Sequence, residues 1–354
     1  MAKKIQILGA GLSGMIAGID LTKRDYEVTI LDGAPGIGGL GNFHPSTHAT
    51  PIDGPAAWRY VGMDLSRNFR PAKAFRVYFG EDGYDLDPCD LFVVERGARE
   101  SSFDTHLYKE AQKLGIKFEF SQSIKNHKDL PPGSIIASGL FPEMFHSLGV
   151  PALKCYGWAV RMPMEREPEV VVYFDSYIGD YYYSSVTNGI FFSMFFQRTD
   201  IPRANMDRCR DFLRRHEKLE TPDWFHATNY VPVGSPRNPR LFAEDKILAG
   251  TLAGMMDPMF FFGINGAMLS GRIAARAVYE PEQAQNDFKF YSRNYASNYR
   301  ARKLQALIPP RLKLRLGKRF LALPESMRRG ILSPDKIGIP GVGSLNLTRV
   351  LRKL

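Results

Sequence analysis

A glycine-rich turn between two short apolar runs lies near the start of the sequence. The apolar run 5–8 leads into Gly9-x-Gly11-x-x-Gly14, a helical pattern follows, and a second apolar run ends at Asp32. Gly9 permits a tight strand-to-helix turn, Gly11 lets the backbone approach a pyrophosphate, and Gly14 lets the helix pack closely on the strand. This order predicts a βαβ unit that binds a dinucleotide.

The residues around this turn fit phosphate and ribose. Leu12 and Ser13 open the expected helix, whose first N–H groups lack intrahelical acceptors and favour an anion. The carboxylate of Asp32 can accept hydrogen bonds from both hydroxyls of an adenosine ribose. We therefore expect an unphosphorylated adenosine ribose at Asp32.

Composition and cysteine usage indicate a globular protein with reduced thiols. The 354 residues suffice for two interlocked domains, and the hydrophobic and charged fractions are ordinary. Cys89, Cys155 and Cys209 are far apart, with no CxxC spacing, so we expect neither a metal site nor a disulfide framework. No secretory pattern precedes the first strand, and we expect a cytoplasmic protein.

The formal net charge of +10 is concentrated in residues 301–354, which hold thirteen Lys and Arg against Glu325 and Asp335. Leucines alternate with these cations, a pattern typical of a segment on the anionic inner face of a membrane. An extension that packs its leucines on the body or on a second subunit fits equally well, because 311–316 has period two and gives no helical stripe. Nucleic-acid binding is disfavoured, since Phe320 is the sole aromatic of this segment. The oligomeric state stays open.

The middle of the chain changes character twice. After the first βαβ unit, the stretch 40–62 reads as an irregular loop, and 103–114 as a helix before a strand. Residues 151–235 contain aromatic and β-branched runs separated by turn residues, which predict an antiparallel sheet interrupted by one helix near 203–218. A strand at 246–249, a glycine-rich loop and a helix at 265–279 follow.

The segment 247–277, ILAGTLAGMMDPMFFFGINGAMLSGRIAARA, carries a family resemblance when it is read with the opening motif. It resembles flavoproteins of the geranylgeranyl reductase and para-hydroxybenzoate hydroxylase group, and the likeness covers most of residues 3–285. The resemblance implies an FAD site, with a helix N-terminus that faces the flavin ring and stabilises its developing negative charge. The positions it assigns to the cofactor, in addition to Gly9, Gly11, Leu12, Ser13, Gly14 and Asp32, are Gly38, Gly39, Ser138, Gly139, Gly250, Thr251, Asp257, Gly263, Ile264 and Asn265.

The implied fold class is α/β. An FAD-binding Rossmann-like domain with three layers (β, β and α) would comprise 1–75, 91–150 and 240–285. An interleaved antiparallel β-sheet substrate domain would comprise 76–90 and 151–239, and the basic C-terminal extension would be 286–354.

This sequence departs from the family pattern at two cofactor positions. The aspartate usual after Gly250 is Thr251, and the Asp-Gly usual in the hydroxylases is Ser138-Gly139. The cysteine that prenyl reductases of the group often carry after the double glycine is also absent, and its region holds His44 and His48. Ser138-Gly139 weakens the hydroxylase interpretation, and the three departures together favour FAD binding over any particular reaction of the family.

Candidate catalytic groups lie in the loop that, by resemblance, approaches the flavin. His44 or His48 could donate the proton that completes alkene reduction, or bind the cofactor, or simply satisfy loop backbone groups. Asp53, Trp58 and Arg59 follow, and Arg59 could bind a pyrophosphate or cap a helix.

Aromatic residues are the candidates for a substrate pocket. Phe260–Phe262 would wall the flavin ring. The strand aromatics could line an apolar pocket, although most of them fit ordinary sheet core equally well; they are Tyr181, Tyr182, Tyr183, Phe191, Phe192, Phe195 and Phe196.

The leading functional hypothesis is an FAD-dependent reductase that saturates a carbon–carbon double bond of a prenyl lipid or quinone-like apolar substrate. The electron donor is NAD(P)H or a ferredoxin, and the sequence does not distinguish them. One alternative is a flavin monooxygenase of the same fold. The other is a membrane-docking electron-relay flavoprotein without small-molecule turnover.

Overall fold

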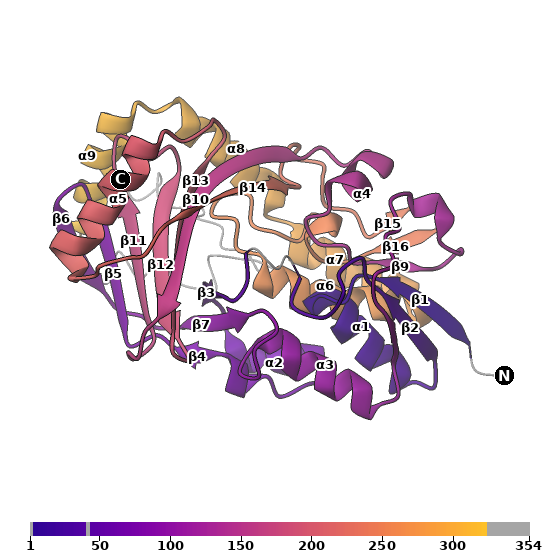
Figure 1. Cartoon of the computed structure of the whole chain (residues 1–354). Helices are drawn as coiled ribbons and strands as arrows, with labels where there is room; N and C mark the ends of the chain where they lie inside the picture. The colour runs from indigo at the N-terminus through magenta and orange to yellow at the C-terminus, as the bar shows by residue number, and fades with distance from the viewer. Residues whose placement is uncertain (1–2, 40–42, 324–354) are drawn as a thin grey trace.

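The computed structural model describes residues 3–39 and 43–323. Figure 1 shows two halves side by side, one built on a parallel sheet and the other on a large, mostly antiparallel sheet. No helix within these ranges is both long and apolar enough to cross a bilayer.

The first half contains a six-stranded sheet in the order β15-β16-β9-β1-β2-β8. Its strands are parallel except for the β15–β16 hairpin. The strands are β1 (Lys4–Leu8), β2 (Glu27–Leu31), β8 (Lys117–Glu119), β9 (Ile135–Ile136), β15 (Phe242–Ala243) and β16 (Lys246–Leu248). Short apolar strands such as β1 and β9 are buried on both faces, as expected for a parallel sheet covered by helices.

Helices pack around this sheet, and the largest interhelical contact joins α1 (Leu12–Thr22) to α6 (Ile264–Tyr279). The other helices of this half are α2 (Gly54–Val61), α3 (Phe103–Lys113), α4 (Pro142–Ser147) and α7 (Pro281–Ser292), with short 3-10 turns at Ser66–Asn68, His127–Asp129 and Gly250–Ala253. Gly271 of α6 lies against the backbone of Ser13, so the two helices approach at glycine. The start of α1 is thereby held against the middle of α6, although the two helices are far apart in sequence.

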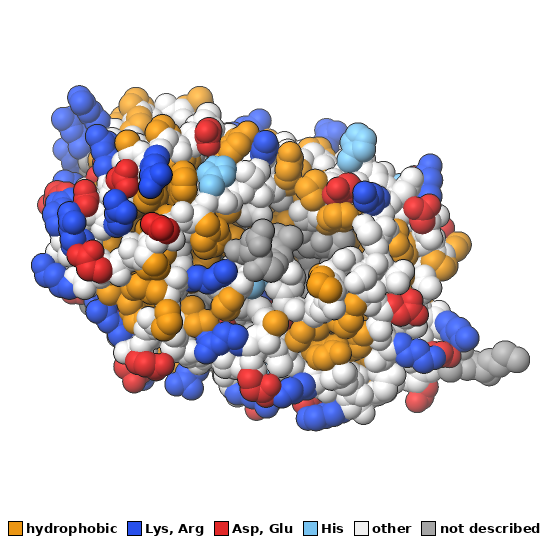
Figure 2. All heavy atoms as spheres, viewed as in Figure 1, with side chains coloured by type: hydrophobic (Ala, Val, Ile, Leu, Met, Phe, Trp, Pro, Cys, Tyr) orange, Lys and Arg blue, Asp and Glu red, His pale blue; other side chains and the backbone are white. Residues whose placement is uncertain are grey.

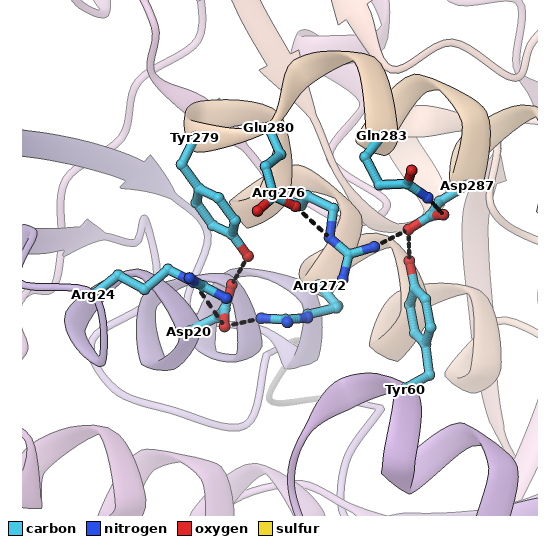
Figure 3. A network of polar contacts seen from close by, with 9 residues as sticks. All are labelled: Asp20, Arg24, Tyr60, Arg272, Arg276, Tyr279, Glu280, Gln283 and Asp287. Atoms are coloured by element: carbon cyan, nitrogen blue, oxygen red, sulfur yellow. Dashed lines mark hydrogen bonds and ion pairs between the residues drawn. The ribbon is translucent and has the colours of Figure 1, made fainter.

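A polar network fixes the outer side of these helices (Figure 3). Asp20 of α1 accepts hydrogen bonds from Arg272 and from the Tyr279 hydroxyl, both on α6. Asp287 of α7 accepts from Arg276 at 2.5 Å and from the Tyr60 hydroxyl at 2.6 Å. The network joins α1, α2, α6 and α7 at a distance from the glycine turn, and it serves the scaffold.

The stretch 40–62, which we expected to be irregular, contains regular structure, and that expectation was wrong. It forms β3 (Ser46–Pro51) and α2 (Gly54–Val61), and β3 pairs with β7 (Leu91–Arg96), which also pairs with β4 (Arg70–Pro71). Asp53 caps α2 by accepting the Ala56 N–H. The strand was missed because its sequence, STHATP, has no run of large apolar residues.

The second half is a seven-stranded sheet in the order β14-β10-β13-β12-β11-β5-β6. Its pairs are antiparallel except β5–β11, which is parallel because β5 enters from a distant part of the chain. The strands are β5 (Ala74–Phe79), β6 (Asp82–Leu86), β10 (Leu153–Pro163), β11 (Glu169–Phe174), β12 (Tyr181–Thr187), β13 (Ile190–Gln197) and β14 (Phe225–Val231).

The two faces of this sheet have different neighbours. One face packs on α5 (Arg203–Phe212) and the π turn Leu213–Glu217, around the stacked rings of Tyr173 and Phe212. The other face lines a cavity, which α9 (Pro310–Leu321) also lines. Helix α8 (Tyr295–Leu307) leads into α9. The leucine-rich segment 311–316 is therefore helical, although its period-two alternation gave no helical stripe.

Candidate dinucleotide and substrate site

The glycine turn has the geometry that its spacing predicts. Gly9 has φ +111°, and a side chain there would overlap the carbonyl group of Ala137 on the neighbouring strand. A side chain on Gly14 would overlap the carbonyl of Gly9. In contrast, a Cβ on Gly11 would meet no atom within 4 Å. Gly9 and Gly14 are therefore required by the protein's own packing, whereas Gly11 leaves open space beside the backbone.

Two helices begin at this space without a cap. The N-caps of α1 (Gly11) and α6 (Gly263) provide no side-chain hydrogen bond, and neither first turn contains an acid. Elsewhere in the same half, the starts of α2 and α3 are capped by Asp53 and Ser102. Because an uncapped helix start presents free N–H groups and a partial positive charge, the two starts together favour a ligand with negative charge.

The acid at the end of β2 is held beside the turn. Asp32 accepts the N–H of Ala10 at 2.6 Å and the N–H of Ala34 at 2.8 Å, one at each carboxylate oxygen. Each carboxylate oxygen has a further lone pair, and Asp32 lines the cavity. The carboxylate is thus fixed by backbone groups and can still accept a hydrogen bond from a hydroxyl of a ligand.

A cavity of about 1300 Å³ runs from the glycine turn to the large sheet. This volume exceeds the roughly 300–1,000 Å³ of ordinary small-ligand pockets. Its lining on the first half includes Gly9–Ser13, Asp32–Gly36 and Ala137–Pro142. Its lining on the second half is apolar and aromatic, with Phe79, Phe174, Tyr181, Tyr183, Met194 and Phe196. The cavity therefore has room for a dinucleotide and for a second, apolar molecule.

Two buried hydroxyls on the cavity wall have no partner among the described residues. Ser138 Oγ and Thr251 Oγ1 are both shielded from solvent and make no hydrogen bond there. A buried hydroxyl without a partner costs free energy, so such groups are expected where a ligand completes the bonding. Thr251 lies in the turn that precedes α6, and Ser138 follows β9. The residues present consequently fit a polar cofactor at this end of the cavity.

The two histidines are joined through a serine. The Ser46 hydroxyl lies 2.7 Å from Nδ1 of His44 and 2.8 Å from Nε2 of His48, and both rings line the cavity. A hydroxyl can donate to one ring while it accepts from the other. The Arg161 guanidinium donates a hydrogen bond to the His44 carbonyl at 3.0 Å. This bond fixes the backbone at the start of the segment 44–48.

Burial keeps both rings neutral at ordinary pH. It lowers the pKa of His44 to about 4, and Arg96 nearby acts in the same direction. It lowers the pKa of His48 to about 3, with His44 and Arg96 as the next causes. Arg96 itself binds Asp104 through two hydrogen bonds of 2.7 and 2.9 Å, which holds α3 against β7.

The loop before α6 is held by a buried carboxylate and a buried guanidinium. Asp257 accepts the N–H groups of Met259 at 3.0 Å and Phe260 at 2.8 Å, and burial raises its pKa to about 7. Arg302 of α8 donates to the Met259 carbonyl and, at 2.5 Å, to Asp180, and it lies 4.0 Å from the ring centre of Phe261. The aromatic loop is therefore fixed from two sides.

The predicted site residues fall into two groups. Those that line the cavity are Gly9, Gly11, Leu12, Ser13, Asp32, Gly39, His44, His48, Ser138, Gly139, Thr251, Gly263 and Ile264. Gly14, Gly38, Gly250, Asp257 and Asn265 lie behind this wall and position it. For example, Asn265 donates to the Pro51 carbonyl at 2.8 Å, which joins α6 to β3.

The aromatic residues that the sequence offered as candidates for the substrate pocket also fall into two groups, those that line the cavity and those that lie in the core. Phe260, Phe261 and Phe262 line the cavity, as do Tyr181, Tyr183 and Phe196. Tyr182, Phe191 and Phe195 belong to the core under α5. Phe192 is fully buried beside Phe43 and His48. The alternation of a strand explains this division, since successive side chains point to opposite faces. Arg59 is exposed and does not line the cavity.

Sequence reasoning missed the contribution of the C-terminal helices. Lys313, Leu314, Gly317 and Phe320 of α9 line the cavity, and Asp180 lies near Lys313 and Arg302. The missed signal was the interleaving of leucines with a glycine in 311–321, which allows a helix to lie close to a sheet. Ser46 between the two histidines was missed as well.

Comparisons with known proteins agree with this geometry. The family of NAD(P)-binding Rossmann-like domains matches residues 7–62, and no curated protein matches the sequence. A geranylgeranyl bacteriochlorophyll reductase-like protein from Thermoplasma acidophilum has a similar structure, with 16% identity over 99% of this chain and 96% of that one, and a TM-score of 0.60. The chain shares the fold of this reductase-like protein.

Other structures of the same fold are enzymes of different kinds. The 2-methyl-3-hydroxypyridine-5-carboxylic acid oxygenase has 12% identity, with 95% of this chain and 98% of that one covered, and a TM-score of 0.61. CtdE, solved in complex with FAD and a substrate, has 12% identity, coverage of 85% and 87%, and a TM-score of 0.58. The flavoprotein fold thus hosts several reactions, and the reaction must be argued from the site.

Proposed function

We propose that this protein is an FAD-dependent oxidoreductase that reduces a carbon–carbon double bond of an apolar substrate such as a prenyl lipid or quinone. One observation carries the proposal. Two uncapped helix starts and two unpartnered buried hydroxyls face one end of a cavity whose other end is apolar and aromatic. The first end suits a dinucleotide, and the second suits a hydrophobic molecule beside it.

The residues at the first end have the chemistry to hold FAD. The open backbone at Gly11 and the start of α1 suit the pyrophosphate, and Asp32 suits the ribose hydroxyls. Thr251 and the start of α6 suit the polar edge of the flavin, where negative charge develops on reduction. Thr251 supplies a neutral hydroxyl at a position where the related families carry a carboxylate.

The residues at the second end favour an elongated apolar substrate. Rings from β5, β11, β12 and β13 face the cavity opposite α9, and α9 adds Leu314 and Phe320. The lining also contains polar residues, among them Asp175, Gln197 and Asn229. A polar corner is formed by Asp180, Arg302 and Lys313, in which burial lowers the pKa of Lys313. A substrate with an apolar chain and a polar or anionic end would match both surfaces.

Bound FAD would supply the hydride. The protein would position the substrate, exclude water from the site and donate a proton. The aromatic walls exclude water and hold the double bond near the cofactor. The His44–Ser46–His48 chain stores an exchangeable proton on a ring nitrogen beside the cavity, and the serine allows it to pass between the rings. Because both histidines are neutral, the ring that donates its N–H proton must regain one, through Ser46 and the other ring and finally from solvent, for the step to balance.

The test is anaerobic. The protein is loaded with FAD, reduced chemically and mixed with prenyl alcohols, prenyl phosphates or prenylated quinones. We expect reoxidation of the flavin, with a product heavier by two hydrogens in mass spectrometry. Failure of every isoprenoid to reoxidise the flavin would contradict the reductase assignment.

The His44→Asn and His48→Gln variants separate the role of the histidines from binding. We expect each to retain FAD and substrate binding and to slow the reoxidation by about 10²–10⁴-fold. A Phe290→Ser variant, at an exposed aromatic outside the cavity, is the matched control and should react normally. Unchanged rates in both histidine variants would mean that these rings only support the loop.

The oxygenase of similar structure keeps a monooxygenase as the second candidate. Oxygen consumption stimulated by an aromatic substrate, with incorporation of one oxygen atom, would favour it over the reductase. The large cavity argues against a pure electron relay, since a relay has no need to enclose a molecule beside the flavin.

A further inference from the structure

Exposed leucines gather where α8 ends and α9 begins. Leu304 and Leu307 of α8 are 65% and 79% exposed, and Leu312 and Leu316 of α9 are 44% and 47% exposed. Most of the large exposed hydrophobic side chains of the described residues belong to this segment. Single exposed leucines need no explanation, but four of them on two consecutive helices indicate an interaction surface.

The segment 303–323, which contains these leucines, is also strongly cationic. Residues 303–323 contain Lys303, Arg311, Lys313, Arg315, Lys318 and Arg319 and no acid. In Figure 2, Lys and Arg side chains lie together with hydrophobic ones at the end of the molecule that α9 occupies in Figure 1. Arg311, Arg315 and Arg319 are exposed and recur at helical spacing beside Leu312 and Leu316. We call the exposed leucines and these three arginines the leucine–arginine surface.

The opposite side of α9 lines the cavity. Leu314, Gly317 and Leu321 lie on this inner side, and Leu321 is buried. Leu316 belongs to both surfaces, because it is 47% exposed and also lines the cavity. A single helix therefore separates the cavity from the leucine–arginine surface. Lys318 is paired with Asp82 of β6, and Arg311, Arg315 and Arg319 are exposed.

We propose that the leucine–arginine surface docks on an anionic lipid bilayer, which places the helix that closes the cavity at the membrane. Apolar side chains would enter the interface while the arginines bind lipid phosphates, as in interfacial amphipathic helices. Charge complementarity favours an anionic bilayer over a second copy of this chain, because a second copy would bring arginines against arginines. The inference deepens the proposed function, since a membrane-borne substrate would then meet α9 first.

The experiment is co-sedimentation of the full-length protein with vesicles of phosphatidylcholine alone or with phosphatidylglycerol added. We expect binding to the anionic vesicles to be at least about tenfold stronger, and to fall as salt rises. Leu304→Ser together with Leu307→Ser should weaken it by about tenfold or more, and so should Arg311→Gln with Arg315→Gln. Leu114→Ser, a change at a 38% exposed leucine of α3, is the control and should bind normally.

Each contrary outcome overturns the docking proposal. Equal binding to neutral and anionic vesicles would remove the role of the arginines. Binding that the leucine substitutions leave unchanged would remove the role of the leucines. A dimer that the same substitutions convert to monomer in light scattering would show that the surface is an interface between copies. Because vesicle binding does not require FAD, its failure is distinguishable from failure of the proposed reaction.

Discussion

Gly317 of α9 lies directly on the ring of Phe79 in β5. A Cβ on Gly317 would overlap atoms of that ring. The Phe79 ring has little freedom to move, because it stacks on Phe174 with the ring centres 4.8 Å apart and the planes at 9°. This contact sets the position of α9 on the apolar side of the cavity, and so links the leucine–arginine surface to the substrate end of the site.

Replacing Gly317 by leucine should therefore displace α9 without affecting the dinucleotide end. We expect a loss of about 1–3 kcal/mol in the free energy of unfolding, as for other overpacked contacts. Hydrogen exchange of 310–321 should accelerate, while FAD affinity stays unchanged. Arg319→Leu, at an exposed position of the same helix, should change stability by less than about 0.5 kcal/mol. Unchanged exchange in Gly317→Leu would mean that α9 adapts to the new side chain.

The glycine turn allows folding and cofactor binding to be tested separately. Gly11→Val places its side chain in open space at an extended backbone position, φ −86° and ψ −175°. We expect a normal melting temperature and a loss of FAD affinity of at least about 100-fold, because the branched side chain occupies the space for the pyrophosphate.

Gly14→Ala is expected to have the opposite effect to Gly11→Val, and to disturb folding in place of cofactor binding. The reason is that its methyl group would overlap the Gly9 carbonyl. It should lower the melting temperature or prevent folding. Circular dichroism reports stability, and flavin fluorescence reports binding. Tight FAD binding by Gly11→Val would contradict the assignment of this turn.

The buried histidines should make the protein sensitive to acid. An ordinary histidine in the unfolded chain binds a proton below pH 6.5, whereas His44 and His48 resist protonation until about pH 4 and 3. The unfolded state therefore binds more protons between pH 6.5 and 4, and stability falls as the pH falls through this window. Each histidine contributes a slope of about 1.4 kcal/mol per pH unit.

The slope is measured as the difference between the wild type and a His44→Asn/His48→Gln double variant. Other groups also titrate as the pH falls. His106, whose pKa burial lowers to about 4, acts in the same direction. Asp257, whose pKa burial raises to about 7, and Asp180, whose pKa burial also raises, act in the opposite direction. All three are retained in the double variant, so their effects cancel in the difference. Parallel stability curves from pH 4 to 6.5 would contradict the depressed histidine pKa values.

Arg302 should be essential for the aromatic loop. Its guanidinium is buried and bonds in two directions, to the Met259 carbonyl and to Asp180. Arg302→Gln would leave the largely buried Asp180 carboxylate without its partner, and we expect a loss of about 3–5 kcal/mol. Asp180→Asn added to Arg302→Gln should recover part of this loss, because the unpaired charge is removed. Chemical denaturation of the two variants measures the difference, and equal stability of both would show that the ion pair is not the cause.

The sequence alone identified the dinucleotide turn because its requirements are local. Gly14 is needed by its contact with Gly9 in the same βαβ unit, and Asp32 ends the strand that follows, so spacing is sufficient to recognise them. Gly9 also avoids a clash with the distant Ala137, but its place in the motif is recognisable from the same spacing. The mixed α/β fold and the aromatic sheet were recognisable for the same reason, since strand and helix periodicities are properties of short segments.

Only the tertiary structure decided which of these residues share the cavity and what encloses it. Tyr181 and Tyr182 are neighbours in one aromatic run, yet the first lines the cavity and the second lies in the core, because the two faces of β12 have different partners. The middle of α6 packs on the start of α1 across more than two hundred residues, and α9 packs on the sheet through one glycine on Phe79. Such contacts depend on how distant elements pack, and a local sequence pattern carries no information about its distant partners.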